Sequence, residues 1–392
     1  MRVVLVSTNA GQSMGGEAIK AYQYFKWLLA AGYDATLVTH ERCRDQLTEF
    51  APERIVYVRD DRLQISLWRA RVTKRLLNGY FHRCARRLIS DRFDPSDTVV
   101  HYLCPISPVE LRFPPKGFRY VIGPLSGYVF YPPAFRAREG RGAALRRSAY
   151  PVVQRLSRLF FGELRGADRI LVSGYERTRR VLKWAGAGDA QMVDVVDAGV
   201  SEDIADAPAP DHTARNGAFV WIGRFTNYKG ADLALRALAL SDADITLTLY
   251  GDGPERSAME ALARSLGVAD RALFAGWLDH DAYVQAMTRY RGLVFPTLSE
   301  ANGIVIQEAM ACGVPVVSLD WGGPSGLASA GEAVLIAPES EEHVIHALAK
   351  AMARLAEGGA EVQKMADAAR ARAQAFRWDV VARSWAQVYD RS

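Results

Sequence analysis

Two glutamates, Glu300 and Glu308, stand with seven residues between them where a strand is expected to give way to a helix. The apolar run 292–297 predicts a buried strand, and the apolar spacing of 304–310 predicts a short helix that ends at Gly313. Glu300 then lies in the loop and Glu308 lies about two turns further along. A carboxylate accepts two hydroxyl donors at once, as the vicinal diols of a sugar or a ribose provide. We expect both glutamates to face one polyhydroxylated ligand.

The residues between the glutamates predict an anion site. The amides of Asn302, Gly303 and Ile304 would be the first donors of the helix, without partners inside it, and a helix start favours negative charge. Such an anion site would suit a diphosphate. Taken alone, two such glutamates are more often a helix cap and a solvated helix residue, so the interpretation depends on the neighbouring segments.

A second block precedes the first. The run 218–224 predicts a strand that ends in Gly223-Arg224, and Lys229-Gly230 opens a predicted helix at 231–239. Alone, Arg224 and Lys229 would more often pair with surface acids. Two glycine-rich turns follow, Gly251-Asp-Gly253-Pro after a strand and Phe-Ala-Gly276 in another. The order and spacing of these segments resemble the G-R-x4-K-G and E-x7-E pattern of retaining glycosyltransferases of the family 4 type, which have the two-lobed GT-B fold.

The resemblance implies roles for these residues. In that family the first glutamate lies beside the donor sugar and the second binds the ribose hydroxyls, which implies these roles for Glu300 and Glu308. Arg224 and Lys229 would bind the phosphates. Arg224 would do so through its planar, two-pronged guanidinium group and Lys229 through a mobile point charge. These two cations would stabilise the charge that develops on the departing phosphate.

Glycines complete the implied donor site. Gly251, Gly253 and Gly276 correspond to family segments that line the nucleotide pocket, where a missing Cβ lets backbone approach a base or phosphate. Near the chain start, a predicted strand at 2–7 precedes Gly15 and Gly16 and a helix from Glu17. The equivalent loop of the family approaches the donor phosphate and the acceptor.

The largest of three departures from the family lies in the first half of the chain; the smaller ones are at 197–201 and at 321–326, where a Gly-x-x-Glu-like loop is replaced. Many members carry a histidine close to the reacting sugar, but the matching segment 119–127 has Gly123 to Ser126 instead. His101, at the end of the predicted strand 98–103, and Ser126 are our candidates for the acceptor side, although a single histidine after a strand is more often structural. Retaining transfer in this family requires no protein base, because the leaving phosphate oxygen takes the proton.

The expected fold is of the α/β class: GT-B, with two Rossmann-like doubly wound parallel-sheet domains facing each other across a cleft. The chain of 392 residues is long enough for two cores. We place the acceptor-binding domain at 1–205, the nucleotide-sugar-binding domain at 216–375, and a C-terminal helix that crosses back to the first domain at 376–392. The Pro- and Asp-rich stretch 203–217 is the expected linker.

Charge is unequally shared between the two halves. Residues 1–200 hold 32 lysines and arginines against 19 acids, a net charge of +13, while residues 201–392 hold 17 against 25, a net charge of −8. Two basic amphipathic segments, at 68–87 and 136–160, suit an anionic membrane surface or an acidic acceptor. Solvated helix faces explain them about equally well. No motif supports nucleic-acid binding.

Composition restricts the remaining possibilities. Cys43, Cys84, Cys104 and Cys312 have no paired spacing, which argues against a zinc site and a disulfide framework. No signal peptide and no apolar run of roughly 20 residues is found, so we expect a cytoplasmic protein, with peripheral binding at the inner face of the membrane as an option. We expect no metal and no cofactor; the donor substrate would be a nucleoside diphosphate sugar, with UDP or GDP favoured.

The sequence therefore predicts metal-independent, retaining transfer of a hexose-type sugar to a glycan or lipid-linked acceptor. Two alternatives stay open: a GT-B nucleotide-sugar epimerase or hydrolase, and a catalytically silent nucleotide-sugar-binding partner protein. A Rossmann oxidoreductase is disfavoured because no G-x-G-x-x-G follows the first strand.

Overall fold

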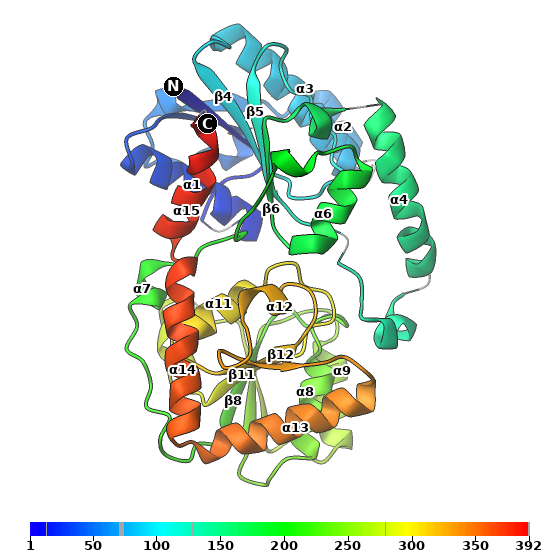
Figure 1. Ribbon diagram of the computed structural model, residues 1–392, viewed down its shortest axis with the longest axis vertical. Coiled ribbons are helices and arrows are strands. Elements are labelled where there is room, and N and C mark those ends of the chain that lie inside the picture. The colour runs from blue at the N-terminus through cyan, green and yellow to red at the C-terminus, as the bar shows by residue number, and fades with distance from the viewer. Residues whose placement is uncertain are drawn as a thin grey trace. The chain divides into compact units, whose positions relative to one another are not determined.

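The structure is a computed structural model that describes residues 1–12, 14–69, 74–127, 129–140, 142–160, 162–278 and 280–390 (Figure 1). Contacts divide the chain into two compact units. Unit 1 comprises Met1–Tyr128, Ala144–Asp197 and Val381–Ser392, and unit 2 comprises Val129–Ala143 and Ala198–Val380. The expected linker at 203–217 lies within unit 2, and so does the segment Val129–Ala143, although sequence position places the latter in the range 1–205.

Unit 1 is built on a seven-stranded parallel sheet of the order β3-β2-β1-β4-β5-β6-β7 within the described residues. The strands are β1 (Arg2–Ser7), β2 (Asp34–His40), β3 (Ile55–Val58), β4 (Thr98–Cys104), β5 (Arg119–Leu125), β6 (Arg169–Val172) and β7 (Met192–Asp194). The helices are α1 (Gly16–Ala30), α2 (Arg62–Arg69), α3 (Lys74–Arg92), α4 (Ala143–Phe160), α5 (Glu163–Gly166) and α6 (Tyr175–Trp184). Short 3-10 turns are η1 (Glu41–Gln46), η2 (Pro52–Arg54) and η4 (Asp189–Gln191).

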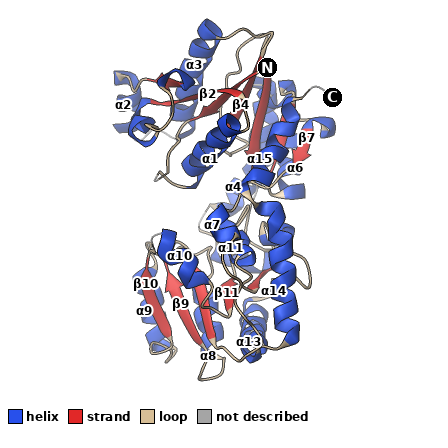
Figure 2. Cartoon of the chain, turned by 90° about the vertical axis from the view of Figure 1, so that its left-hand side faces the viewer, coloured by secondary structure: helices blue, strands red, loops and turns tan. Residues whose placement is uncertain are grey.

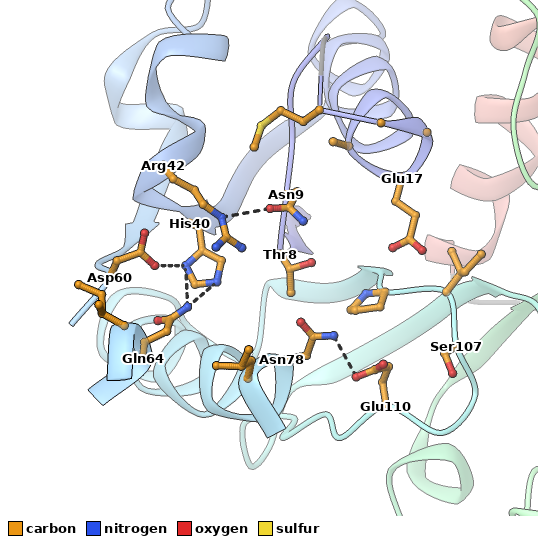
Figure 3. Close-up of a pocket in the computed structure, with 18 residues that line it drawn as sticks. Thr8, Asn9, Glu17, His40, Arg42, Asp60, Gln64, Asn78, Ser107 and Glu110 are labelled. Atoms are coloured by element: carbon orange, nitrogen blue, oxygen red, sulfur yellow. Dashed lines mark hydrogen bonds and ion pairs between the residues drawn. The ribbon is translucent and has the colours of Figure 1, made fainter. Parts of the chain in front are cut away.

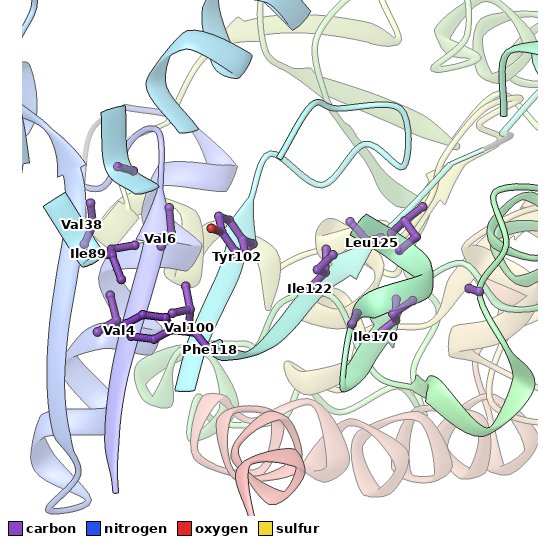
Figure 4. Packing of buried hydrophobic residues seen from close by; sticks show 14 of the residues in the cluster. Val4, Val6, Val38, Ile89, Val100, Tyr102, Phe118, Ile122, Leu125 and Ile170 are labelled. Atoms are coloured by element: carbon purple, nitrogen blue, oxygen red, sulfur yellow. The ribbon is translucent and has the colours of Figure 1, made fainter. Parts of the chain in front are cut away.

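The central strands of unit 1 read as almost continuous apolar runs because helices cover both faces of a parallel sheet. Val3 to Val6 of β1 are fully buried. Since alternate residues of a strand point to the same face, Val4 and Val6 join Val100 and Tyr102 in one hydrophobic cluster under α3 (Figure 4). The loops at the strand ends therefore project from a closely packed sheet.

The chain ends within unit 1. The helix α15 (Trp378–Ala386) and the turn η6 (Gln387–Tyr389) follow the turn η5 (Gln374–Phe376). The Trp385 indole donates to the Val196 carbonyl at 2.9 Å, and the Tyr24 and Tyr389 hydroxyls lie 2.8 Å apart. These buried hydrogen bonds hold the last turns of the chain against α1.

Unit 2 has a six-stranded parallel sheet of the order β10-β9-β8-β11-β12-β13 within the described residues (Figure 2). Its strands are β8 (Ala218–Ile222), β9 (Thr246–Tyr250), β10 (Ala272–Gly276), β11 (Gly292–Phe295), β12 (Val316–Leu319) and β13 (Val334–Ile336). Its helices are α7 (Glu202–Ala205), α8 (Ala231–Ala239), α9 (Arg256–Ser265), α10 (His280–Met287), α11 (Ile304–Ala311), α12 (Pro324–Leu327), α13 (Glu341–Glu357) and α14 (Ala360–Ala373), with the turn η3 (Pro133–Arg138).

Both sheets reverse their strand order once, between β1 and β4 in unit 1 and between β8 and β11 in unit 2. In doubly wound sheets, loops diverge at such a point and leave a crevice at the carboxyl ends of the strands, where ligands bind. The expected α/β class with two doubly wound parallel sheets is confirmed.

Candidate active site

The loops that follow β8 and β11 form the candidate donor site of unit 2, and backbone contacts tie them together. The Leu298 amide donates to the Tyr228 carbonyl at 2.7 Å, and the Trp221 indole donates to the Lys229 carbonyl at 3.2 Å. Gly230 has a φ of 72°, and a Cβ there would lie 2.1 Å from the Pro296 carbonyl oxygen. Only glycine fits this contact, so the two loops keep a fixed spacing.

Lys229 and Glu300 form an ion pair between these loops. Their side chains are 18% and 19% exposed, so both charges are largely removed from solvent. The Lys229 ammonium also lies 5.2 Å from the centre of the Phe295 ring. The structure therefore joins a cation and a carboxylate that are far apart in sequence, at the point where the strand order reverses.

The helix α11 begins at this same place. Gly303 precedes it with a φ of 88°, a backbone conformation that favours glycine. The Ile304 side chain is partly exposed. The side-chain amide of Asn302 donates to Gln307 Oε1 at 3.4 Å. The first amides of α11 have no partners within the helix, so this end of the helix can bind an anion.

Glu308 lies one helical turn further along α11. The Tyr283 hydroxyl of α10 donates to Glu308 Oε2 at 2.6 Å. Burial and the neighbouring Glu308 carboxylate raise the pKa of Tyr283 well above its usual value, which keeps the hydroxyl protonated as a donor. This contact orients the carboxylate, and no sequence motif pointed to Tyr283.

Three glycines shape the neighbouring loops after β9 and β10. A Cβ on Gly251 would lie 1.9 Å from the Gly223 carbonyl oxygen, and one on Gly253 would lie 2.5 Å from the Phe225 carbonyl oxygen. The Gly251 amide donates to the Gly276 carbonyl at 2.7 Å. These loops therefore pack directly on the turn that carries Arg224.

Arg224 itself is exposed and makes no ion pair within the described part of the chain. Its backbone is nevertheless fixed, because the Thr226 hydroxyl donates to the Arg224 carbonyl at 3.3 Å and the Phe225 amide donates to the Asp252 carbonyl at 3.0 Å. Its guanidinium group is thus available for a ligand on a rigid backbone.

Two further segments support the site: the loop at 321–326, noted in the sequence only as a departure from the family, and the segment 129–143, for which no motif was found. A Cβ on Gly322 would lie 2.6 Å from the Glu300 carbonyl oxygen, and the Gly323 amide donates to that carbonyl at 2.8 Å. The Val129 carbonyl accepts from the Ser299 hydroxyl at 2.9 Å, and Tyr131 donates to Asn227 Oδ1 at 2.9 Å. The segment 129–143 therefore braces the loops that hold Lys229 and Glu300.

Unit 1 has an open cavity of about 770 Å³ at its own strand-order reversal. Gly15 and Gly16 line it together with polar side chains from several segments (Figure 3): Thr8, Asn9, Glu17, His40, Arg42, Asp60, Gln64, Asn78, Ser107 and Glu110. Gly15 has a φ of 96° and precedes α1. The predicted glycine loop thus lies at this cavity.

His101 and Ser126 lie elsewhere in unit 1. His101 is fully buried, and its ring nitrogens contact the Gly123 carbonyl at 2.7 Å and the Tyr389 hydroxyl at 2.5 Å. Burial lowers the pKa of His101 to about 4. Ser126 is also buried, and its amide donates to the Ile106 carbonyl at 3.0 Å. Since both residues are buried within unit 1, we do not carry them into the proposed site.

Among the described residues, no group of three or more His, Cys, Asp or Glu side chains is placed to hold a metal ion. Among the helices in the same described ranges, none is both long and apolar enough to span a bilayer.

The two parallel sheets, each with one strand-order reversal, define a GT-B fold. Solved structures agree: sucrose-phosphate synthase from Thermosynechococcus elongatus superposes with a TM-score of 0.69 at 19% identity, covering 99% of this chain and 98% of that one. Anabaena HepE in complex with UDP and glucose gives a TM-score of 0.64 at 16% identity, covering 99% of each chain.

Sequence comparison is more specific. Residues 209–372 match the family Glycosyl transferases group 1, and this part of the chain is a domain of that family. The 2-deoxystreptamine glucosyltransferase of Streptomyces kanamyceticus is 36% identical over 186 residues, which cover 41% of this chain and 48% of the relative. The chain spans about half the length of the curated relatives it matches.

Proposed function

We propose that this chain is a retaining glycosyltransferase that moves a hexose-type sugar from a nucleoside diphosphate sugar to a glycan or lipid-linked acceptor, without a metal ion. The observation that carries the proposal is the Lys229–Glu300 pair beside the start of α11. A cation suited to phosphate, a carboxylate suited to sugar hydroxyls and helix amides without partners inside the helix lie together at one sheet edge, within residues that match the family. The HepE complex supports UDP as the carrier, with GDP as the second candidate.

In the proposed site each residue has one task. Arg224 and Lys229 bind the diphosphate together with the amides of Asn302, Gly303 and Ile304. Glu300 accepts hydrogen bonds from the sugar, and Glu308, oriented by Tyr283, accepts them from the ribose. Gly251, Gly253 and Gly276 let the nucleotide approach the backbone, and Gly15 and Gly16 belong to the cavity of unit 1.

The proposed reaction needs little chemistry from side chains. The bond between the anomeric carbon and the phosphate oxygen breaks, and the acceptor oxygen bonds to the same face of that carbon. The acceptor proton passes to the leaving phosphate oxygen. Arg224 and Lys229 stabilise the negative charge that grows on the phosphate, an interaction stronger in the transition state than in the bound donor.

A binding screen tests the donor site. UDP, GDP, ADP and dTDP and their common sugars are titrated by calorimetry and thermal shift in EDTA, against wild type, Glu308→Ala and Glu342→Ala. Glu342 is an exposed residue of α13 and serves as the matched control. We expect one nucleotide to bind wild type and the control, with a loss of about 1–3 kcal/mol in Glu308→Ala. No binding by any nucleotide would overturn the proposal.

Product analysis separates the alternatives. Sugar release or epimerisation without an acceptor would identify a hydrolase or epimerase, and donor binding without turnover would identify a silent binding protein. Glu300→Ala should mainly reduce use of the sugar, by about 1–3 kcal/mol. Equal and negligible effects in Glu300→Ala and Glu308→Ala would contradict the assigned roles.

The helix α4 supports peripheral binding to an anionic membrane as part of this proposal. Its exposed apolar residues Leu145, Val152, Leu156 and Leu159 fall within about 60° of one another around the helix. Arg146 and Arg155 flank this stripe on either side. Such a basic amphipathic face suits an anionic bilayer. The other basic segment, at 68–87, lies partly outside the described residues.

Co-sedimentation with vesicles tests this surface. Wild type should bind vesicles with anionic lipid and not those of zwitterionic lipid alone, and Leu156→Asp/Leu159→Asp should lose binding while keeping nucleotide affinity. Equal binding of the double variant and wild type would remove α4 from the proposal.

A further inference from the structure

The cavity of unit 1 carries a charge of the opposite sign to its surroundings. Residues 1–200 have a net charge of +13, yet the described residues that line the cavity include three carboxylates, Glu17, Asp60 and Glu110, and one guanidinium, Arg42. Neither solubility nor attraction to an anionic membrane explains an acidic cavity in a basic part of the chain. Recognition of a ligand of complementary charge would explain it.

One end of the cavity holds an excess of hydrogen-bond acceptors. His40 Nδ1 lies 3.1 Å from Asp60 Oδ1, and the Gln64 amide nitrogen lies 3.0 Å from His40 Nε2 (Figure 3). Burial and then the nearby Arg42 lower the pKa of His40 to about 3, so the ring is neutral at neutral pH. The ring then donates from Nδ1 to Asp60 and accepts at Nε2 from Gln64.

This arrangement leaves the Gln64 carbonyl oxygen without a partner among the described residues, although Gln64 is only 5% exposed. An unpaired buried acceptor is unfavourable unless a donor reaches it. Gln64 lines the cavity, and its shielded oxygen can gain a partner when the side chain turns toward a ligand.

The other end of the cavity holds Glu17 and Glu110 (Figure 3). Glu110 accepts from the Asn78 amide at 3.1 Å. Partial withdrawal from solvent raises the pKa of Glu17; Lys20 opposes this rise, whereas Asp197 and Glu110 add to it. Lys20 is itself paired with Asp197. Arg112, which donates to the Ser107 carbonyl at 3.1 Å, also lowers the pKa of Glu17, so one guanidinium group stands beside the two carboxylates of Glu17 and Glu110.

We infer that the acceptor unit bound in this cavity is a polyol that carries at least one protonated amine, with the ammonium group between Glu17 and Glu110 and hydroxyl groups toward Gln64 and Asp60. This inference rests on the proposed glycosyl transfer and adds the chemical class of the acceptor. A cavity of about 770 Å³ accommodates an amino sugar or aminocyclitol. A phosphorylated ligand would bring negative charge against the two glutamates.

Calorimetry on the full chain, without donor, tests the inference with ligands that differ in charge. The probes are 2-deoxystreptamine, a diaminocyclitol; D-glucosamine, an amino sugar; myo-inositol, a neutral cyclitol; and myo-inositol 1-phosphate, an anionic one. We expect at least one amine to bind 10-fold or more tightly than the neutral and anionic probes, and the stronger of the two amines identifies the ring type. Equal binding, or preference for the phosphate, would overturn the inference.

Variants locate the charge. Glu17→Gln and Glu110→Gln should each weaken amine binding about 10-fold and leave myo-inositol unchanged, whereas Glu49→Gln, an exposed residue of unit 1 that does not line the cavity, should change neither. Nucleotide binding, measured in the same samples, also reports folding. Failure of the nucleotide screen sinks the proposed transferase, while intact nucleotide binding without amine preference sinks only this inference.

Discussion

The loops after β8 and β11 in unit 2 and the loops after β1 and β4 in unit 1 leave the same topological point of two similar sheets, yet they form different kinds of site. In unit 2 the loops are locked by glycine contacts and by one ion pair. In unit 1 an open cavity is lined by polar side chains from several segments. Under the proposed function, a rigid site suits the nucleoside diphosphate part of the donor, which is shared across a family. An open site suits an acceptor, which varies from one enzyme to another.

The largest expected effect tests how rigid the site in unit 2 is. Gly230 and Gly267 have φ values of 72° and 69°, but only at Gly230 would a Cβ meet backbone; at Gly267 nothing lies within 4 Å. Gly267→Ala should cost about 1 kcal/mol of stability from backbone strain alone. Gly230→Ala should cost more than about 3 kcal/mol and abolish nucleotide binding, measured by urea unfolding and calorimetry. Similar losses in both variants would show that the loop can move.

The ion pair gives the next largest effect. Lys229→Met leaves Glu300 unpaired in a largely buried place, so we expect a loss of about 2–3 kcal/mol. The double variant Lys229→Met/Glu300→Leu removes both charges and should regain most of that stability while remaining unable to use the donor. Urea unfolding together with a turnover assay measures both quantities. A double variant as unstable as Lys229→Met would mean that the pair does not decide stability here.

These two tests address the part of the molecule that the sequence describes well. Arg224, Lys229 and Glu300 are read from local spacing because each lies in a loop with glycines close by, and Glu308 is read from the helix that follows the last of these loops. The strands and helices that carry them are also found where apolar patterns predict, for example α8 at Ala231–Ala239.

The cavity of unit 1 could not be read in this way. Its lining residues Glu17, His40, Asp60, Gln64 and Glu110 have no regular spacing, because the order of strands in the sheet, not the order in the chain, brings them together. The same holds for Tyr131, whose contact with Asn227 joins distant segments. Only packing reveals such neighbours.

Acid sensitivity should also distinguish the units. In the described ranges unit 1 contains three buried histidines with lowered pKa values, His40, His82 and His101, and unit 2 contains one, His212. Protonation favours the unfolded state when the folded pKa is the lower one. The contribution of His40 is full above its unfolded pKa of about 6.5 and is lost as the pH falls toward its folded pKa of about 3.

We therefore expect unit 1 to lose protection before unit 2 between pH 7 and pH 5, with His40 alone contributing about 2 kcal/mol over that interval. Hydrogen exchange resolved by peptide measures this difference. His40→Gln should flatten the pH dependence in unit 1 and leave unit 2 unchanged. Equal loss of protection in both units would contradict the prediction.

The smallest effect concerns the orientation of Glu308. Tyr283→Phe removes a hydroxyl donor and leaves the ring in place, so nucleotide affinity should fall by about 1 kcal/mol, roughly 5-fold. The thermal stability of the protein should change little. A loss as large as that of Glu308→Ala would indicate that Tyr283 itself touches the nucleotide.

The Lys229–Glu300 pair also has a consequence for selection among ligands. While the site is empty, the Lys229 ammonium and the Glu300 carboxylate pair with each other. A small anion that binds Lys229 alone therefore leaves the Glu300 carboxylate without a partner. A molecule that presents phosphate and hydroxyl groups together compensates both at once. In the proposed transfer, the pair can re-form once the diphosphate has left and would then oppose rebinding of the nucleoside diphosphate. The Lys229–Glu300 ion pair thus competes with ligands for both side chains. A molecule that carries phosphate and hydroxyl groups together displaces it more readily than either group alone.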